Sequence, residues 1–263
     1  MAKAKIAASR TPRILLYDLE TSHNLVAVFS LKNQDWIAPE NIIQERFVIC
    51  ASWKWLGDKT VHSVSVLDNR KLYKSNPHDD SHVLATLHGV LMTADVIVAH
   101  NGNDFDAKFA AGRMLIHGFS PLPPIPQIDT LKVARERFLL NANNLDYLGR
   151  LLKVGRKKPT TTGLWLRILK GDAAAVAEMV RYNKQDVLLL ERVFLKLQPY
   201  IANHPSRHLF GAGGTCPRCG SHHVQARGIH KALTQTYQRW QCIACGGWFR
   251  SKKSLGTVPT RVL

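Results

Sequence analysis

The stretch "ILLYDLETS" (residues 14–22) begins as an apolar run and then places two acids, Asp18 and Glu20, two positions apart. Such a run predicts a central β-strand, in which side chains two residues apart point to the same face. Two carboxylates on one face of a buried strand repel each other and lose hydration. Either that face is open to water, or a positive charge lies between the two acids.

The composition is that of a globular protein, because 45% of the 263 residues are hydrophobic. No apolar run is long enough to predict a membrane-spanning helix. The basic segment 1–11 lacks the apolar core of a secretory signal, and it predicts a disordered arm or an organellar transit signal. We therefore expect a protein that is not secreted and resides in the cytoplasm.

The charge of the chain is strongly positive and unevenly distributed. The formal net charge is +17, from 36 Lys and Arg against 19 Asp and Glu. All 19 acids lie at or before Glu191, and the residues after it carry 11 Lys and Arg without an acid. A basic tail of this kind is attracted to polyphosphates, so it indicates nucleic acid as a partner. The alternative is a solvated basic surface without a partner.

The order of the expected elements predicts an α/β domain over residues 12–200, with a mixed sheet covered by helices. The first three expected strands suit antiparallel neighbours. The strand-like runs and helical segments are residues 13–20, 25–31, 47–55, 60–67 and 95–101 for strands, and 79–94, 104–118 and 172–197 for the main helices. Residues 201–214 contain Pro, Gly and Asn with little periodicity, which predicts a linker.

Four of the five cysteines form two C-x-x-C pairs, Cys216 with Cys219 and Cys242 with Cys245. Four thiolates suit one tetrahedral Zn²⁺ ion and leave no open position for catalysis. The strand-like residues between the pairs predict a β-hairpin that bridges two metal-binding turns. We therefore expect a structural zinc ribbon over residues 215–254, followed by a tail at 255–263, in a reducing compartment.

The ribbon pattern "CPRCGS…YQRWQCIACGGWF" resembles the zinc ribbons of insertion-sequence transposases and other DNA-handling proteins. This resemblance implies that the ribbon binds nucleic acid through its basic residues, which are Arg218, Arg227, Lys231, Arg239, Arg250, Lys252 and Lys253. The aromatic residues either stack on bases or form the small core of the ribbon. They are Tyr237, Trp240, Trp248 and Phe249.

Two further acids stand in a setting that matters for chemistry. Asp106 begins the expected helix that follows a buried strand, and Tyr182 and Asp186 lie four residues apart on one face of the last long helix. The apolar residues after Asp186 must pack on the sheet, so this acid can face the end of the first strand. Three carboxylates with Asp106 nearby would be a costly cluster without metal. With two divalent cations it becomes a phosphate-cleaving site, and Mg²⁺ or Mn²⁺ suits its oxygen ligands.

These residues resemble the three motifs of the DnaQ-like 3′–5′ exonucleases, which have an RNase H-like fold. The motifs are "DLE" at Asp18–Glu20, N-x-x-x-F-D at Asn101–Asp106 and Y-x-x-x-D at Tyr182–Asp186. The tyrosine spacing indicates the DEDDy branch, because Arg181 stands where the other branch has histidine.

By this resemblance, Asp18, Glu20 and Asp186 hold the first metal ion and Asp18 shares the second. Asp106 supports the site, largely through water. Tyr182 orients the attacking water or helps remove its proton, and the ordinary tyrosine pKa of about 10 favours orientation.

The resemblance implies a metal-dependent 3′–5′ exonuclease, with single-stranded DNA as the first expectation. An RNA-trimming exoribonuclease, a structure-selective endonuclease and a non-catalytic nucleic-acid-binding module remain alternatives. Asn101 either approaches the substrate or makes a strand-end hydrogen bond, and Asp129 is a helix cap or a ligand. Lys157 and Lys158 in the basic loop either touch nucleic acid or stay solvated. The expected cofactors are two Mg²⁺ or Mn²⁺ ions and one Zn²⁺ ion, and no particular protein partner is predicted.

Overall fold

The computed structural model describes residues 10–30, 32, 35–210 and 214–259. These residues form two compact units, each described here by itself. The sheet unit consists of residues 13–132 and 141–193, and the ribbon unit contains residues 194–263 together with 133–140 and the first 12 residues. Most of the basic arm expected at 1–11 lies outside the described residues.

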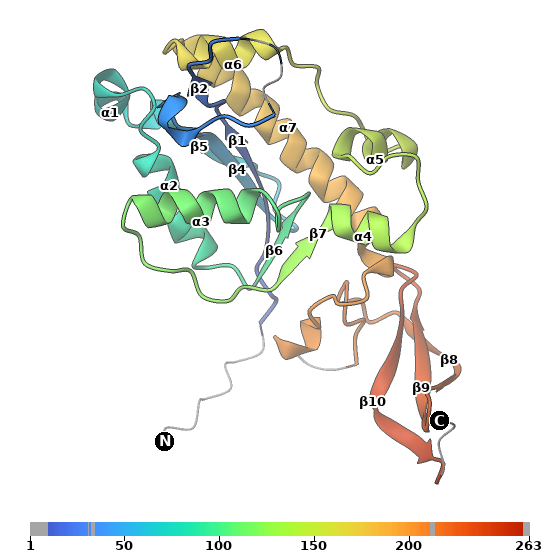
Figure 1. Cartoon of the computed structure of the whole chain (residues 1–263). Helices are drawn as coiled ribbons and strands as arrows, with labels where there is room; N and C mark the ends of the chain where they lie inside the picture. Colours follow the sequence, from blue (N-terminus) through green and yellow to red (C-terminus); the bar gives the residue numbers. More distant parts are fainter. Residues whose placement is uncertain (1–9, 31, 33–34, 211–213, 260–263) are drawn as a thin grey trace. The chain divides into compact units, whose positions relative to one another are not determined.

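The sheet unit is built around a five-stranded mixed sheet in the order β5-β4-β1-β6-β7 (Figure 1). The strands are β1 (Ile14–Thr21), β4 (Val48–Trp55), β5 (His62–Ser65), β6 (Val96–Ala99) and β7 (Gln127–Asp129). β1 pairs antiparallel with β4 and parallel with β6, so it lies at the centre of the sheet, where its apolar run is buried. The predicted α/β architecture, a mixed sheet flanked by helices, is confirmed.

The prediction of a strand over residues 25–31 is wrong. Within the described part of that segment only β2 (Leu25–Val26) forms, and it pairs with β3 (Ile42–Gln44) in a separate two-stranded sheet. Both sides of β1 are already taken by β4 and β6, so no edge is left for another neighbour. Leu25 and Phe29 are exposed, so the apolar run buries no face. The antiparallel neighbours of the sheet are instead β1 with β4 and β4 with β5.

Seven α-helices surround the sheet or follow it among the described residues. They are α1 (Arg70–Ser75), α2 (Ser81–Leu91), α3 (Asp106–Ile116), α4 (Thr130–Arg137), α5 (Leu145–Leu151), α6 (Thr162–Leu169) and α7 (Ala173–Leu197). The helices expected at 79–94, 104–118 and 172–197 are confirmed as α2, α3 and α7. Asp172 caps α7, because its Oδ1 accepts hydrogen bonds from the backbone N–H groups of Ala174 and Ala175. No helix in the described ranges has the length and apolar character needed to cross a bilayer.

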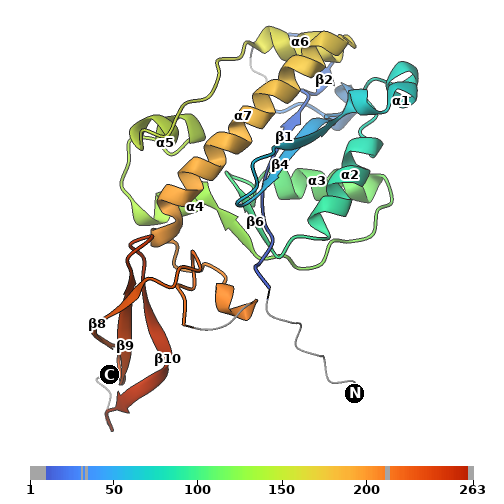
Figure 2. The same cartoon turned by 180° about the vertical axis from the view of Figure 1, so that it is seen from behind.

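The alternation of β1 divides its side chains between two faces. Leu15, Tyr17 and Leu19 are buried, and Tyr17 lines a cavity together with residues of α3. Figures 1 and 2, which view the molecule from opposite sides, place α2 and α3 on one face of the sheet and α7 on the other. Asp18 and Glu20 therefore point toward the α7 face, as the spacing of two residues predicts.

The orientation of α3 is fixed by a buried ionic network. Asp80, which is fully buried, accepts hydrogen bonds from the backbone N–H of Val48, from two nitrogens of the Arg113 guanidinium and from His117 Nε2 if that nitrogen is protonated. The network ties β4 to α3, and α3 carries Asp106 in its first turn. Buried charges are retained when they are paired and hydrogen-bonded in this way.

The ribbon unit contains a three-stranded antiparallel sheet in the order β10-β9-β8. Its strands are β8 (Val224–Lys231), β9 (Gln235–Cys242) and β10 (Trp248–Thr257). β8 and β9 form the hairpin predicted between the two cysteine pairs, whereas β10 follows the second pair and was not predicted. Its pairing with β9 gives the small sheet a protected central strand.

Candidate active site and zinc centre

Three carboxylates converge on the α7 face of the sheet. Asp18 and Glu20 come from β1 and Asp186 comes from α7, and one ligand oxygen of each lies within 4.8 Å of the others. We call these three residues the acidic cluster. Asp186 is fully buried, so the face is not simply open to water. An arrangement of oxygen ligands at this spacing can hold a divalent cation between them.

The environment of the acidic cluster opposes ionisation of its members. Burial raises the pKa of Asp18 well above its usual range, and the carboxylates of Asp106 and Glu20 raise it further. Burial is also the main reason that the pKa of Glu20 rises to about 8. Carboxylates that share a buried site repel one another, and a bound cation removes that repulsion. The donor set and its electrostatics therefore fit a divalent metal.

Asp106 lies beside the acidic cluster but is not one of its three converging ligands. Asp106 is not the N-cap of α3, which is Phe105, and its Oδ1 accepts a hydrogen bond from the Leu19 N–H at 3.0 Å. Burial raises the pKa of Asp106 to about 6. This carboxylate thus holds the backbone between Asp18 and Glu20.

Tyr182 lies one helical turn before Asp186, at the edge of the acidic cluster. Its hydroxyl is 3.2 Å from Lys157 Nζ. Burial and the nearby Asp186 carboxylate raise the pKa of Tyr182 to about 12. The hydroxyl therefore stays protonated at neutral pH, where it can donate and accept hydrogen bonds.

Two residues at the site were missed or left undecided by sequence reasoning. Asn183, which is fully buried, donates from Nδ2 to Asp18 Oδ2 at 2.6 Å. It lies three residues before Asp186 on the same face of α7, and helical periodicity could have found it. Lys157 Nζ lies 2.7 Å from Asp186 Oδ2. Lys158 is exposed, in agreement with the solvated alternative for that residue.

Asp129 braces the loop after β6 and stands outside the acidic cluster. Its Oδ1 accepts hydrogen bonds from the backbone N–H groups of Asn101 and Leu131, both at 2.9 Å. The cap role is thus the one that the structure favours. Asn101 adopts a left-handed backbone conformation, with φ of 66°, two residues after the end of β6. Its contact with substrate remains a prediction.

The four predicted zinc ligands converge in the ribbon unit. The Sγ atoms of Cys216 and Cys245 are 3.7 Å apart, and so are those of Cys219 and Cys242. A tetrahedral Zn²⁺ with Zn–S bonds of about 2.3 Å separates its sulfur ligands by about 3.8 Å. Each C-x-x-C turn ends in a glycine with positive φ, Gly220 or Gly246. The cluster therefore fits one zinc ion, and Cys50 lies apart from it in the core.

The basic side chains of the ribbon unit differ in the contacts that they make. The Arg218 guanidinium donates to the carbonyls of Ile201 and Trp248 at 3.0 and 2.7 Å, so it holds the ribbon unit together. The guanidinium carbon of Arg239 lies 5.1 Å from the centre of the Trp248 ring, and that of Arg250 lies 3.7 Å from the centre of the Tyr237 ring. Arg227 and Lys231 are exposed on β8. Phosphate contact by any of these residues remains a prediction.

The aromatic residues of the ribbon divide between its two faces. The β9–β10 register pairs Arg239 with Arg250 and Trp240 with Phe249, so the arginines share one face and the two aromatic rings share the other. Trp240 and Phe249 line a cavity together with residues of the segment before the first cysteine pair. They are partly buried and correspond to the core alternative, as does Tyr237, which is buried, whereas Trp248 is half-exposed beneath Arg239.

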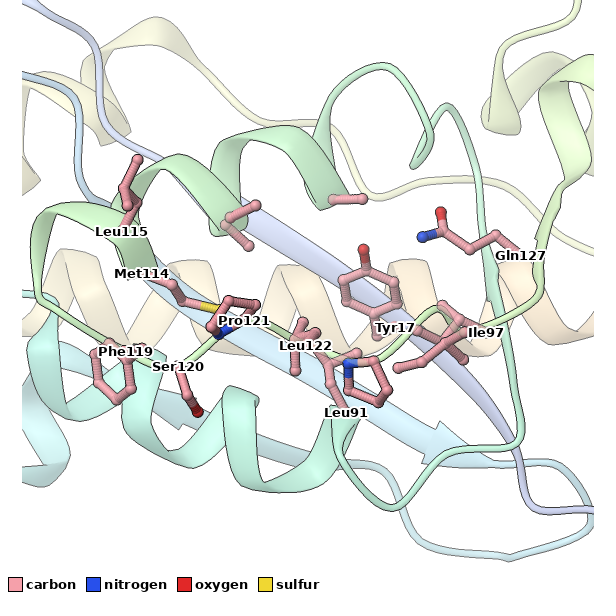
Figure 3. Close-up of a pocket in the computed structure, with 15 residues that line it drawn as sticks. Tyr17, Leu91, Ile97, Met114, Leu115, Phe119, Ser120, Pro121, Leu122 and Gln127 are labelled. Atoms are coloured by element: carbon pink, nitrogen blue, oxygen red, sulfur yellow. The ribbon is translucent and has the colours of Figure 1, made fainter. Parts of the chain in front are cut away.

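An apolar cavity of about 420 Å³ lies on the other side of β1 (Figure 3). Tyr17 projects into it between α3 and the segment from Phe119 to Gln127, and burial raises the pKa of this phenol above its usual range. Since Tyr17 and Asp18 are neighbours on a strand, their side chains point to opposite faces. The cavity is therefore separate from the acidic cluster.

Comparison with known proteins places the chain in a superfamily. A family model described as RNase H superfamily (RNase_H_2) matches residues 55–198, more than half of the chain, so the chain belongs to the RNase H superfamily. The match includes Asp106, Tyr182 and Asp186 and begins after Asp18 and Glu20. Nucleases of this superfamily are typically metal-dependent phosphodiester hydrolases, and membership supports nuclease activity in general.

A solved structure shares the fold at low sequence identity. The family B DNA polymerase from the hyperthermophilic archaeon Pyrobaculum calidifontis matches with a TM-score of 0.53 and 14% identity. The match covers 86% of this chain and 32% of the polymerase, so the chain spans about a third of that protein's length. No match was found among curated protein sequences.

The raised pKa of Glu20 predicts how stability depends on pH when no divalent cation is added. The folded protein holds the Glu20 proton more tightly than the unfolded chain, whose pKa is near 4.5. The protonated Glu20 side chain therefore stabilises the folded protein relative to the unfolded chain. This contribution to the free energy of unfolding is fully present below about pH 4.5 and is lost as the pH rises through about 8. Between these limits we expect the melting temperature of the wild type to fall by about 5 °C more than that of Glu20→Gln. Parallel melting profiles of the two proteins would contradict the assignment.

Proposed function

We propose that the protein is a metal-dependent 3′–5′ exonuclease of the DEDDy type, related to the DnaQ-like enzymes. The observation that carries the proposal is the convergence of Asp18, Glu20 and Asp186 on one face, with Tyr182 one turn away on α7. Single-stranded DNA is the proposed substrate. An RNA-trimming activity is the second candidate, because the same acidic cluster can act on the phosphodiester bonds of DNA or of RNA. Discrimination between the two depends on contacts to the 2′-OH.

In this proposal the acidic cluster holds the first divalent cation, Mg²⁺ or Mn²⁺, and Asp18 shares the second. When bound, such cations lower the pKa of a water molecule and stabilise charge that develops on a phosphate. Tyr182 orients the attacking water through its protonated hydroxyl. Asn183 fixes the Asp18 carboxylate, and Asp106 keeps the β1 backbone in place between the two acids that it presents.

The test of this activity uses a 5′-labelled single strand, prepared as DNA and as RNA of the same sequence, with Mg²⁺ or Mn²⁺. A ladder of products that shortens stepwise from the 3′ end supports exonuclease activity. The relative cleavage rates of the two strands show whether DNA or RNA is preferred. A circular single strand in parallel should remain intact. Cleavage of the circle would identify an endonuclease, and no cleavage of any strand would leave a binding module.

We infer that the ribbon unit binds nucleic acid through the face of its sheet that carries Arg239 and Arg250. Each guanidinium lies over an aromatic ring, which orders a positive charge beside a flat apolar surface. A base can stack beside the half-exposed Trp248 ring while phosphates pair with the two arginines, whereas the Tyr237 ring is buried beneath Arg250. The absence of acids after Glu191 leaves the positive potential of this part of the chain uncancelled.

The double variant Arg239→Gln/Arg250→Gln should weaken binding of a single strand by about tenfold and lower the salt slope of log K by about 1 to 2. Fluorescence anisotropy over a series of salt concentrations measures both quantities. The matched control is Arg70→Gln/Lys71→Gln, which removes the same charge from exposed positions on α1 of the sheet unit. Equal losses in the two double variants would show that only net charge matters and would contradict a role for this face.

The proposal also includes the domain limits and the location. We propose that residues 12–200 form the nuclease domain, 201–214 the linker, 215–254 the zinc ribbon and 255–263 the tail. A zinc ribbon with four thiolate ligands is suited to a reducing compartment such as the cytoplasm.

A further inference from the structure

Lys157 forms an ion pair within the acidic cluster. Its Nζ lies 2.7 Å from Asp186 Oδ2 and 3.2 Å from the Tyr182 hydroxyl. The Asp186 side chain is fully buried and the Lys157 side chain is 31% exposed, so the ammonium group reaches inward from the edge of the site. This contact places a positive charge against one of the three carboxylates that converge there.

The backbone that carries Lys157 is anchored independently of this ion pair. The Lys157 N–H donates a hydrogen bond to Asp146 Oδ1 at 2.9 Å, and Asp146 belongs to the first turn of α5. The neighbouring side chains of Arg156 and Lys158 are exposed. A lysine tethered at its backbone can release its ammonium group from Asp186 by rotating the four-carbon side chain, without unfolding the loop.

The charge balance of the site favours the ammonium form of Lys157. Burial alone would lower the pKa of the amine, but the carboxylates of Asp186 and Asp18 outweigh this effect and raise the pKa above its ordinary value. Lys157 in turn opposes the rise in the pKa of Glu20. The lysine therefore offsets part of the repulsion that a divalent cation would also offset.

We propose that Lys157 and a divalent cation compete for the carboxylate of Asp186. This inference rests on the proposed metal centre and names the group that regulates its loading. A cation that binds the acidic cluster must displace Lys157 Nζ, so Lys157 lowers the apparent affinity of the centre. Once displaced, the ammonium group lies in a cleft of about 530 Å³ that is lined by one acid, Asp146, by three basic residues, Arg150, Arg156 and Lys158, and by Tyr182. Its next partner there is an anion such as a substrate phosphate.

The first test measures Mn²⁺ affinity by calorimetric titration of the full, zinc-loaded chain. Removing a charge that lies within hydrogen-bonding distance of a ligand should make Lys157→Met bind Mn²⁺ at least about tenfold more tightly than the wild type. Lys158→Met, which removes the same charge one residue away from an exposed position, should change the affinity by less than about twofold. Equal or weaker Mn²⁺ binding by Lys157→Met overturns the proposal.

A second test uses the wild-type protein and does not depend on how a variant folds. An amine-acylating reagent followed by mass spectrometry reports how accessible each lysine is. We expect the acylation rate of Lys157 to rise several-fold when Mn²⁺ is added, while that of Lys158 stays constant. An unchanged rate at Lys157 under saturating Mn²⁺ overturns the displacement.

The variant Asp18→Asn separates the failure of this inference from the failure of the proposed function. If Asp18→Asn loses Mn²⁺ binding while Lys157→Met binds as the wild type does, the metal centre stands and only the competition is wrong. If Asp18→Asn and the wild type bind Mn²⁺ equally, the acidic cluster is not the metal centre and both proposals fall.

Discussion

The variant Asp18→Asn should lose roughly a thousandfold or more of the divalent-cation-dependent cleavage of a single strand. The substitution keeps the size of the side chain and removes one negative charge at the point where β1 faces α7. In the proposed mechanism Asp18 contributes to both cation positions, so its loss affects both at once. The rate of product formation from a 5′-labelled strand under saturating Mg²⁺ measures the effect.

The same substitution should not destabilise the fold. Burial and neighbouring carboxylates hold the pKa of Asp18 well above its usual range, so the charged form is costly in the absence of a cation. A neutral amide relieves that cost, although it turns the contact with Asn183 into a bond between two amides. We therefore expect the melting temperature without added divalent cation to stay equal or to rise.

The matched control is Asp104→Asn. Asp104 belongs to the same sequence motif as Asp106, but it is exposed and pairs with Lys108 and Lys132 on the surface. Loss of the Asp104 charge should change the rate of cleavage by less than about threefold, because exposed ion pairs contribute little to the stability of a fold. Retention of a tenth or more of the activity in Asp18→Asn would contradict the assignment of the acidic cluster as the catalytic centre.

The second large effect is expected from Cys216→Ser, which should release the zinc ion and unfold the ribbon. Nearly every residue of β8 is exposed, and the small sheet has little apolar core of its own. Binding of structural zinc by four thiolates contributes on the order of 10 kcal/mol to such folds. Loss of one ligand leaves three cysteines and an unsatisfied coordination position, so the metal should be lost with the fold.

Zinc content and limited proteolysis measure the outcome together. We expect the zinc content of Cys216→Ser to fall from about one ion per chain to near zero, with rapid cleavage after residue 214 and a protected sheet unit. Cys50→Ala is the matched control, because this thiol lies in the core of the sheet unit and outside the zinc cluster. A Cys216→Ser protein that resists protease and still carries stoichiometric zinc would show that the ribbon does not depend on this ligand.

The features that sequence could predict are those with a strong local signature. Alternation along β1 placed Asp18 and Glu20 on one face, and helical periodicity placed Tyr182 and Asp186 on one side of α7. The C-x-x-C spacing likewise predicted the four-cysteine cluster. In each case the spacing along one element, or the geometry of one metal, determines which side chains can meet.

The features that sequence could not predict depend on the packing of distant segments. The apolar run 25–31 has strand propensity, but the edges of β1 were already occupied, and only the assembled sheet shows this. Lys157 sits in an irregular loop, so no periodicity links it to Asp186, 29 positions further along the chain. Trp240 packs in the ribbon whereas Trp248 is half-exposed, and this difference depends on which face of the ribbon sheet is covered. That too is a property of the tertiary structure.

The hydrogen bond from the Leu19 amide to Asp106 gives the site a spectroscopic reporter. That amide lies between the two acids of β1, so its nitrogen resonance and its solvent exchange rate follow the charge on Asp106. As Asp106 takes up a proton near pH 6, the amide loses an ionised acceptor, and its proton resonance should move upfield. An isotope label at one leucine would therefore record ionisation inside the site in real time, without substrate and without any change to the acids themselves.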